Sequence, residues 1–254
     1  QKMILPFGLG EEPLFIRKNL RNGDNFNLNP FENKEADLVG MNLNFRKSLF
    51  FNRGKQHHST TYSFLLNESQ NLLSVGSISS KNQSHQLQYQ HLVKKSWLFN
   101  FSGSKTSSQS ISENYPSRNF EIKSYKIEPK IGYLFSKNAS WTVFYEYQQK
   151  ENQIGAFETL TQTQLGTSFM FNSEKGFSMN GEFSMYNNSY DGNALSAVGF
   201  QMLEGLQPGK NKTWRLLLQK NLTQYLDINI NYQGRNSETS KTIHTGNIQL
   251  RAFF

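Results

Sequence analysis

Histidine is the residue type of this sequence best suited to chemistry, because imidazole can act as a metal ligand, a base or an acid near neutral pH. The chain has His57, His58, His85, His91 and His244. His57 and His58 are adjacent, and adjacent residues of a strand point to opposite faces. With no cysteine in the chain and no carboxylate cluster near these residues, we predict no metal site and no other cofactor.

Hydrolysis would require a nucleophile, a base and an orienting group within reach of one another. His244 and Asp191 are the best candidates for such a pair at the rim of a barrel. No ordered Ser/His/carboxylate pattern surrounds them, and no glycine-rich loop could hold a phosphate group. We therefore predict no catalytic residues, and an outer-membrane hydrolase is the least favoured function.

Charged side chains follow a regular pattern, because most of them fall on the polar side of strand-like segments. These residues are Arg46, Lys126, Glu128, Lys130, Glu146, Glu182, Arg215, Asp227 and Arg251. A lysine or arginine on a lipid-facing surface costs roughly 2–4 kcal/mol at mid-depth, so strands that cross a bilayer must sort their charges in this way. We predict that these charges face a lumen, either as the lining of an open channel or as ion pairs in a filled interior.

Period-two alternation positions these charges, and it runs through most of the chain from Leu38 onward. The clearest example is residues 125–135, where odd positions are mostly apolar and even positions up to Lys130 are charged. We predict eleven strands, with short turns near residues 53, 95, 138, 174 and 222 and mostly longer links near 74, 111, 153, 200 and 237. Outer-membrane barrels show this asymmetry, with short periplasmic turns and long outer loops.

Composition favours the same fold class. Hydrophobic residues make up 36% of the chain and aromatic residues 14%; soluble domains are about 45–50% apolar when glycine is counted, and disordered chains are poor in aromatics. A transmembrane barrel explains both values, because each strand has one lipid face and one polar face. We predict an all-β, antiparallel up-and-down barrel of about 12 strands in the bacterial outer membrane, formed by residues 38–254.

Aromatics near strand ends, such as Trp97 and Trp141, predict interfacial girdles. A carbohydrate-stacking surface is the alternative.

Residues 1–37 are less regular, because Pro6, Pro13 and Pro30 interrupt any long element. We expect an irregular lead-in or outer loop, with a candidate strand at 13–20. That strand would make the count even, as in bacterial single-chain barrels. The alternative is that further strands precede this segment in a longer protein.

The formal net charge of +8 predicts attraction to anionic outer-membrane lipid and to lipopolysaccharide phosphates. Nucleic-acid binding would require a basic patch with stacking aromatics. Because the cations are dispersed and the aromatics follow the strand pattern, we predict no nucleic-acid partner.

The last strand shows the alternation without error. Ile248, Leu250, Ala252 and Phe254 are predicted to face lipid, while Gln249 and Arg251 point inward. A final amphipathic strand that ends on an aromatic residue resembles the closing strand of bacterial outer-membrane barrels. The resemblance implies the barrel-assembly machinery as a partner, because in that family the machinery recognises this strand.

Residues 202–214 (MLEGLQPGKNKTW), followed by Tyr232–Arg235 and Ile243–Gly246, are similar to the C-terminal barrel region of large outer-membrane proteins of Bacteroidota. The earlier strands share with that family only the alternation of apolar and polar residues. The resemblance implies an outer-membrane location and a longer parent chain, and it implies no catalytic residues. A distinct loop in this segment is a candidate plug or docking loop, with Met202, Leu203, Gly205, Pro208, Gly209 and Trp214 as its residues.

Together these patterns favour a structural or interaction component of a larger envelope protein or multi-subunit complex, concerned with export, assembly or surface attachment. Other envelope proteins are its expected partners. A porin-like diffusion or substrate-uptake channel is the alternative.

Overall fold

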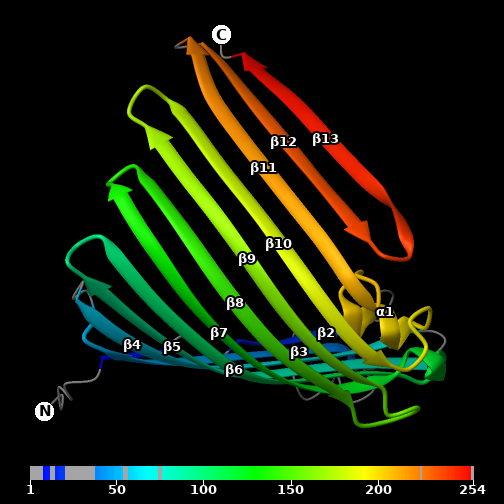
Figure 1. Cartoon of the computed structure of the whole chain (residues 1–254). Coiled ribbons are helices and arrows are strands. Elements are labelled where there is room, and N and C mark those ends of the chain that lie inside the picture. The colour runs from blue at the N-terminus through cyan, green and yellow to red at the C-terminus, as the bar shows by residue number, and fades with distance from the viewer. Residues whose placement is uncertain are drawn as a thin grey trace, which may run out of the picture.

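The computed structural model describes residues 8–11, 15–20, 38–53, 57–73, 76–223 and 225–252. Nearly all of them form one antiparallel sheet in which each long strand pairs with the next (Figure 1). The long strands are β3 (Leu38–Phe51), β4 (His58–Leu73), β5 (Gly76–Val93), β6 (Trp97–Ser112), β7 (Phe120–Ser136), β8 (Ala139–Asn152), β9 (Thr159–Ser173), β10 (Phe177–Asp191), β11 (Gly209–Thr223), β12 (Leu226–Ser237) and β13 (Ser240–Ala252). The predicted all-β, up-and-down fold is confirmed.

Two short strands form one edge of the sheet. β1 (Gly8–Glu11) lies opposite residues 47–50 of β3, and β2 (Phe15–Leu20) lies opposite residues 38–44. Because β1 and β2 pair with successive parts of the same strand, they share one strand position beside the eleven long strands. β2 falls within the segment 13–20 that the sequence predicts as a strand.

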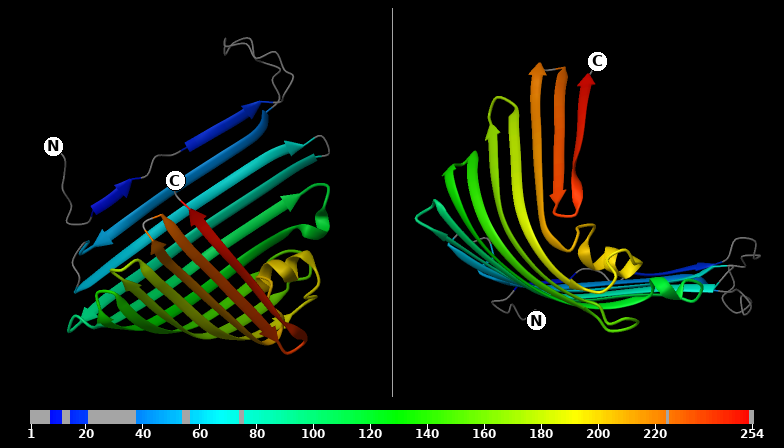
Figure 2. Two further views of the ribbon diagram at one scale, coloured as in Figure 1. Left: turned by 90° about the horizontal axis from the view of Figure 1, so that it is seen from above. Right: turned by 45° about the vertical axis from the view of Figure 1, so that its right-hand side comes forward.

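Closure is the point where the structure departs from the predicted barrel. β13 pairs only with β12 in the described part of the chain, and the other edge ends at β1 and β2. The sheet is therefore a curved trough with two open edges (Figure 2). Closure would require a continuous first strand alongside β13, whereas β1 and β2 have four and six residues.

The longer links predicted near residues 74, 111 and 237 lie mostly within strands instead. The polar stretch 67–82 lies almost wholly in β4 and β5, much of 104–118 lies in β6, and 234–240 is mostly the β12–β13 hairpin. The 18 residues of β5 span about 60 Å at ~3.3 Å per residue, twice the ~30 Å hydrocarbon core of a bilayer. The ends of these strands project beyond the lipid, so they lack the apolar alternation that identifies a strand in the sequence. Polar cross-strand contacts join them, such as Ser69 Oγ to Ser80 Oγ at 2.8 Å.

The predicted short turns all join consecutive strands at one end of the sheet, which we call the short-turn end. At the other end, the loop end, residues 113–119 contain the 3-10 helix η1 (Pro116–Arg118) and residues 192–208 contain α1 (Ala197–Leu203). The sequence predicts a helical turn at 200–204. The helix begins earlier because Ser196 Oγ accepts a hydrogen bond from the Gly199 N–H at 2.9 Å, and it ends at Glu204 with φ of 53°. No helix in the described ranges is long and apolar enough to cross a membrane.

Candidate functional site

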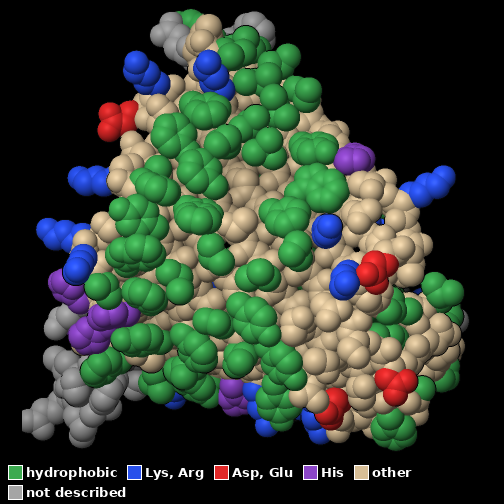
Figure 3. Space-filling view, viewed as in Figure 1, with side chains coloured by type: hydrophobic (Ala, Val, Ile, Leu, Met, Phe, Trp, Pro, Cys, Tyr) green, Lys and Arg blue, Asp and Glu red, His purple; other side chains and the backbone are tan. Residues whose placement is uncertain are grey.

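The outer face of the sheet is the face that carries Tyr125 and Ile127, and it is covered with exposed apolar side chains (Figure 3). They include Tyr62, Leu87, Tyr89, Trp97, Phe99, Phe101, Ile131, Phe135, Trp141, Val143, Tyr145, Leu165, Phe183, Met185, Ile248 and Leu250. An apolar surface that extends over strand after strand is unstable in water. It matches the lipid-facing band of an outer-membrane barrel. This face agrees with the predicted location in the bacterial outer membrane; Phe254 lies outside the described residues.

The inner face carries the charges that the sequence assigns to a lumen, and most of them are arranged in pairs. Lys126 Nζ lies 3.3 Å from Glu146 Oε2, and Lys130 Nζ lies 2.8 Å from Glu128 Oε1. Ser102 Oγ also donates a hydrogen bond to Glu128 at 3.1 Å.

Two further pairs of charges follow from the strand register. Glu182 lies directly opposite Arg215, and Asp227 lies opposite Arg251. Arg46 is apart from the others on β3, opposite Leu65. The side-by-side placement of opposite charges lowers the cost of burying them on a sheet that crosses a bilayer.

Two of the histidines pair with tyrosine hydroxyls on the neighbouring strand. The Nδ1 atom of His85 lies 2.7 Å from the Tyr62 hydroxyl, and that of His244 lies 2.8 Å from the Tyr232 hydroxyl. Two strands separate His244 on β13 from Asp191 on β10, so these rim candidates are not neighbours. Within the ranges that the structure describes, no group of three or more His, Asp and Glu side chains could hold a metal ion.

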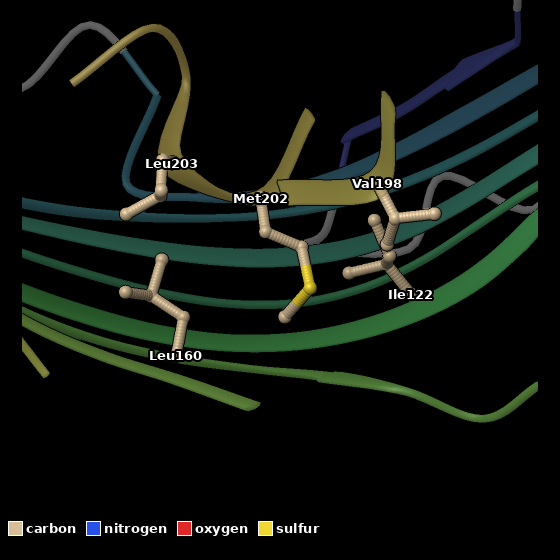
Figure 4. Packing of buried hydrophobic residues seen from close by; sticks show 5 residues of the cluster. All are labelled: Ile122, Leu160, Val198, Met202 and Leu203. Carbon is tan, nitrogen blue, oxygen red and sulfur yellow. The ribbon is translucent and has the colours of Figure 1, made fainter. Parts of the chain in front are cut away.

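Residues 192–208, which we call the folded-in loop, cover part of the inner face at the loop end. Val198, Met202 and Leu203 of α1 form a buried cluster with Ile122 of β7 and Leu160 of β9 (Figure 4). Met202 is 0% exposed and Leu203 is 1% exposed. Burial of one such side chain contributes roughly 1.5–3 kcal/mol, so the cluster holds α1 against the sheet.

Lys150 ties the C-terminal end of α1 to β8. Its side chain is almost fully buried, Nζ donates a hydrogen bond to the Met202 carbonyl oxygen at 2.8 Å, and the same ammonium pairs with Glu204. A buried ammonium without partners is strongly unfavourable. The folded-in loop therefore provides both the carbonyl and the carboxylate that this lysine needs.

A second set of polar contacts holds the part of the loop after α1. The carbonyl oxygen of Gln207 accepts hydrogen bonds from Asn211 Nδ2 at 2.7 Å and from Asn188 Nδ2 at 3.0 Å. Arg235 donates to the Gly205 carbonyl oxygen at 3.2 Å. Because these donors belong to β10, β11 and β12, the loop is fastened to three neighbouring strands.

Most of the predicted plug-or-docking residues belong to this loop or border it. Met202 and Leu203 are in the buried cluster, while Gly205 and Gly209 have φ of 78° and 84°, a conformation that favours glycine. Pro208 directly precedes β11. Trp214 is not part of this inner-face site, because it shares the outer phase of β11 and packs over Gly234 of β12.

Sequence reasoning missed Lys150, Asn188 and Asn211 as residues that fasten the loop. A usable signal was present in Ile122 and Leu160, which are apolar residues in the polar phase of their strands, close to the loop end. Such an exception to alternation indicates that something covers the inner face there.

No protein-family model and no curated protein matches the sequence. Solved structures of similar fold include two autotransporter domains. The translocator domain of the autotransporter NalP from Neisseria meningitidis has a TM-score of 0.35 and 9% identity, over 85% of this chain and 82% of that chain. The beta domain of the Bordetella autotransporter Brka has a TM-score of 0.38 and 8% identity, over 98% of this chain and 100% of that chain.

Proposed function

We propose that this protein is a structural and interaction component of the outer membrane, part of a larger envelope protein or complex concerned with export, assembly or surface attachment. The folded-in loop is the observation that supports this function. It is fixed to the inner face by an apolar cluster, by Lys150 and by hydrogen bonds from three strands. An open diffusion channel requires free space at that position.

The rest of the inner face is suited to polar contact with a partner segment. A depression of about 300 Å³ lies along β4–β7, and its lining includes Thr61, Gln88, Ser102, Lys126 and Glu128. Hydroxyl and amide groups of this kind provide both donors and acceptors for a polypeptide backbone. The partner would meet a hydrated polar surface beside the charge pairs.

A diffusion or uptake channel is the second candidate, and the continuous polar lining of β5 and β6 favours it. Gln86, Gln88 and Gln90 alternate along β5, and Asn100 and Ser102 lie beside them on β6. If the folded-in loop moves away from the sheet, this lining would border a water-filled path.

Planar-bilayer recording separates the two functions. We expect no steady conductance from the native protein and frequent conductance steps from Lys150→Met, because the variant removes the cation that fastens α1. Lys210→Met is the matched control: Lys210 is exposed at the rim and pairs with Glu238 at 3.9 Å, so its loss should leave the recording unchanged. Equal, steady conductance from native and Lys150→Met protein would favour the channel instead.

The partners follow from the same proposal and from the resemblance to large outer-membrane proteins of Bacteroidota. The expected partners are the barrel-assembly machinery, lipopolysaccharide and other envelope proteins. Crosslinking in whole cells, followed by purification in detergent, should recover specific envelope proteins. Recovery of the chain alone under conditions that capture a known envelope complex would contradict the role in a complex.

A further inference from the structure

Aromatic side chains form a notch on the outer face near the short-turn end. Trp97 of β6 lies directly opposite Tyr133 of β7, which in turn lies opposite Trp141 of β8. The Trp97 and Tyr133 rings have centroids 4.9 Å apart, and so do the rings of Tyr133 and Phe135. Together with Ile131 and Val143 they line a depression of about 570 Å³, which we call the aromatic notch.

The aromatic notch is open, and one of its rings is held in place by a hydrogen bond. Trp97 is 44% exposed and Phe135 is 58% exposed, so the described side chains do not cover it. The indole N–H of Trp141 donates a hydrogen bond to Thr167 Oγ1 at 2.6 Å, which holds that ring in place. Its lining is made of apolar and aromatic side chains, which accept hydrocarbon.

Cations flank the aromatic notch on the side of the short turns. Lys94 and Lys95 form the β5–β6 turn, and Lys137 lies in the β7–β8 turn, two residues after Phe135. All three side chains are exposed, and among the described residues none of them makes an ion pair. Their ammonium groups are therefore free to bind an anion from outside the protein.

The surplus of positive charge extends along this end of the sheet (Figure 3). Arg53, Lys175 and Lys220 belong to neighbouring turns or strand ends, while the carboxylates there are Glu174 and Asp227. At the loop end, by contrast, cations alternate with carboxylates such as Glu113, Glu121, Glu151, Glu158 and Glu238. The short-turn end is thus the end that attracts anions.

We propose that the aromatic notch and its three lysines bind an anionic phospholipid, with one acyl chain in the notch and the headgroup phosphate at Lys94, Lys95 and Lys137. The inference rests on the proposed membrane-spanning function. Aromatic rings of an outer-membrane barrel lie at headgroup level, and clustered lysines at a membrane surface attract anionic lipid. The apolar notch would hold the acyl chain, and the lysines in the adjoining short turns would hold the phosphate. The bound lipid would fix how deeply the sheet lies in the bilayer.

Tryptophan fluorescence can test this binding. The chain has three tryptophans, so Trp214→Phe leaves Trp97 and Trp141 as the emitters. The full chain is folded into phosphatidylcholine vesicles that contain either phosphatidylglycerol or phosphatidylcholine with brominated acyl chains, which quench nearby tryptophan. We expect brominated phosphatidylglycerol to reach half of its quenching at a mole fraction on the order of tenfold lower than brominated phosphatidylcholine.

Two triple variants complete the experiment. Lys94→Gln/Lys95→Gln/Lys137→Gln should abolish the preference for the anionic lipid. The control, Lys210→Gln/Lys212→Gln/Lys241→Gln at the loop end, removes the same charge and should retain the preference. Equal quenching by the two lipids in the native protein, or equal loss in both variants, would overturn the inference. Quenching by neither lipid would instead contradict the membrane-spanning function itself.

Discussion

At the residue scale, Lys150 connects the sheet to the folded-in loop. Its ammonium group is buried on one side by α1, while the partner carboxylate of Glu204 has a side chain that is 66% exposed. Water therefore weakens the ion pair. The hydrogen bond from Lys150 to the Met202 carbonyl is the more protected contact, and it satisfies a carbonyl near the C-terminal end of α1.

Lys150→Met should release the loop without unfolding the sheet, because the strand pairing of β8 does not involve this side chain. We expect cleavage within residues 192–208 by an added protease to become several-fold faster. The measurement is limited proteolysis of the folded protein in vesicles, with Lys210→Met as the control. An unchanged cleavage rate would show that the apolar cluster alone holds the loop.

Phe144 and Gly166 form a second contact that depends on one residue. A Cβ atom added at Gly166 would lie 2.2 Å from Cζ of Phe144, which lies on the inner face. Gly166→Ala should destabilise the fold by roughly 1–3 kcal/mol, because the ring must move within a packed site. Urea unfolding in vesicles would measure this change.

Two variants define the cause of that loss. Gly103→Ala is the control, since the nearest atom to its new Cβ is 3.9 Å away, and it should leave the midpoint almost unchanged. Adding Phe144→Ala to Gly166→Ala should recover part of the lost stability. Equal effects at Gly103 and Gly166 would rule out the collision.

At the scale of the element, each strand has a lipid face and an inner face. Ile127 is 47% exposed on the outer face of β7, and Gln148 lies on the inner face of β8, opposite Lys126. Ile127→Lys should reduce membrane insertion strongly, because a lysine in lipid costs roughly 2–4 kcal/mol at mid-depth. Gln148→Lys should insert almost normally. Heat-modifiable mobility of the folded barrel on gels would report insertion, and similar losses for both variants would contradict the assigned faces.

Alternation made the strands within the membrane predictable, because lipid forces every second side chain to be apolar. The ends of β4, β5 and β6 were predicted as loops since they project into water and are polar on both faces. Met202 and Leu203 were predicted as part of a plug or docking loop, but the strands that α1 covers were not predictable from its own residues. Ile122 and Leu160, apolar residues in a polar phase, indicated that the inner face is covered there.

At the scale of the whole molecule, the sheet has two different ends. The short-turn end is basic and borders the aromatic notch, while the loop end carries mixed charges and the folded-in loop. These differences give the sheet a direction across the membrane. The inward charges and the apolar outer face lie on the faces predicted from the sequence, whereas the described residues do not close the sheet between β13 and the first strand position.

The most direct test of the account is labelling of single cysteines in intact cells, which is clean because the native chain has no cysteine. Leu195, at the loop end, is 92% exposed, and Lys137 lies in a short turn. With a membrane-impermeant maleimide, we predict that Leu195→Cys is labelled in intact cells and that Lys137→Cys is labelled only after the outer membrane is permeabilised. Equal labelling of both sites in intact cells would contradict a sheet that spans the outer membrane with its loop end outward.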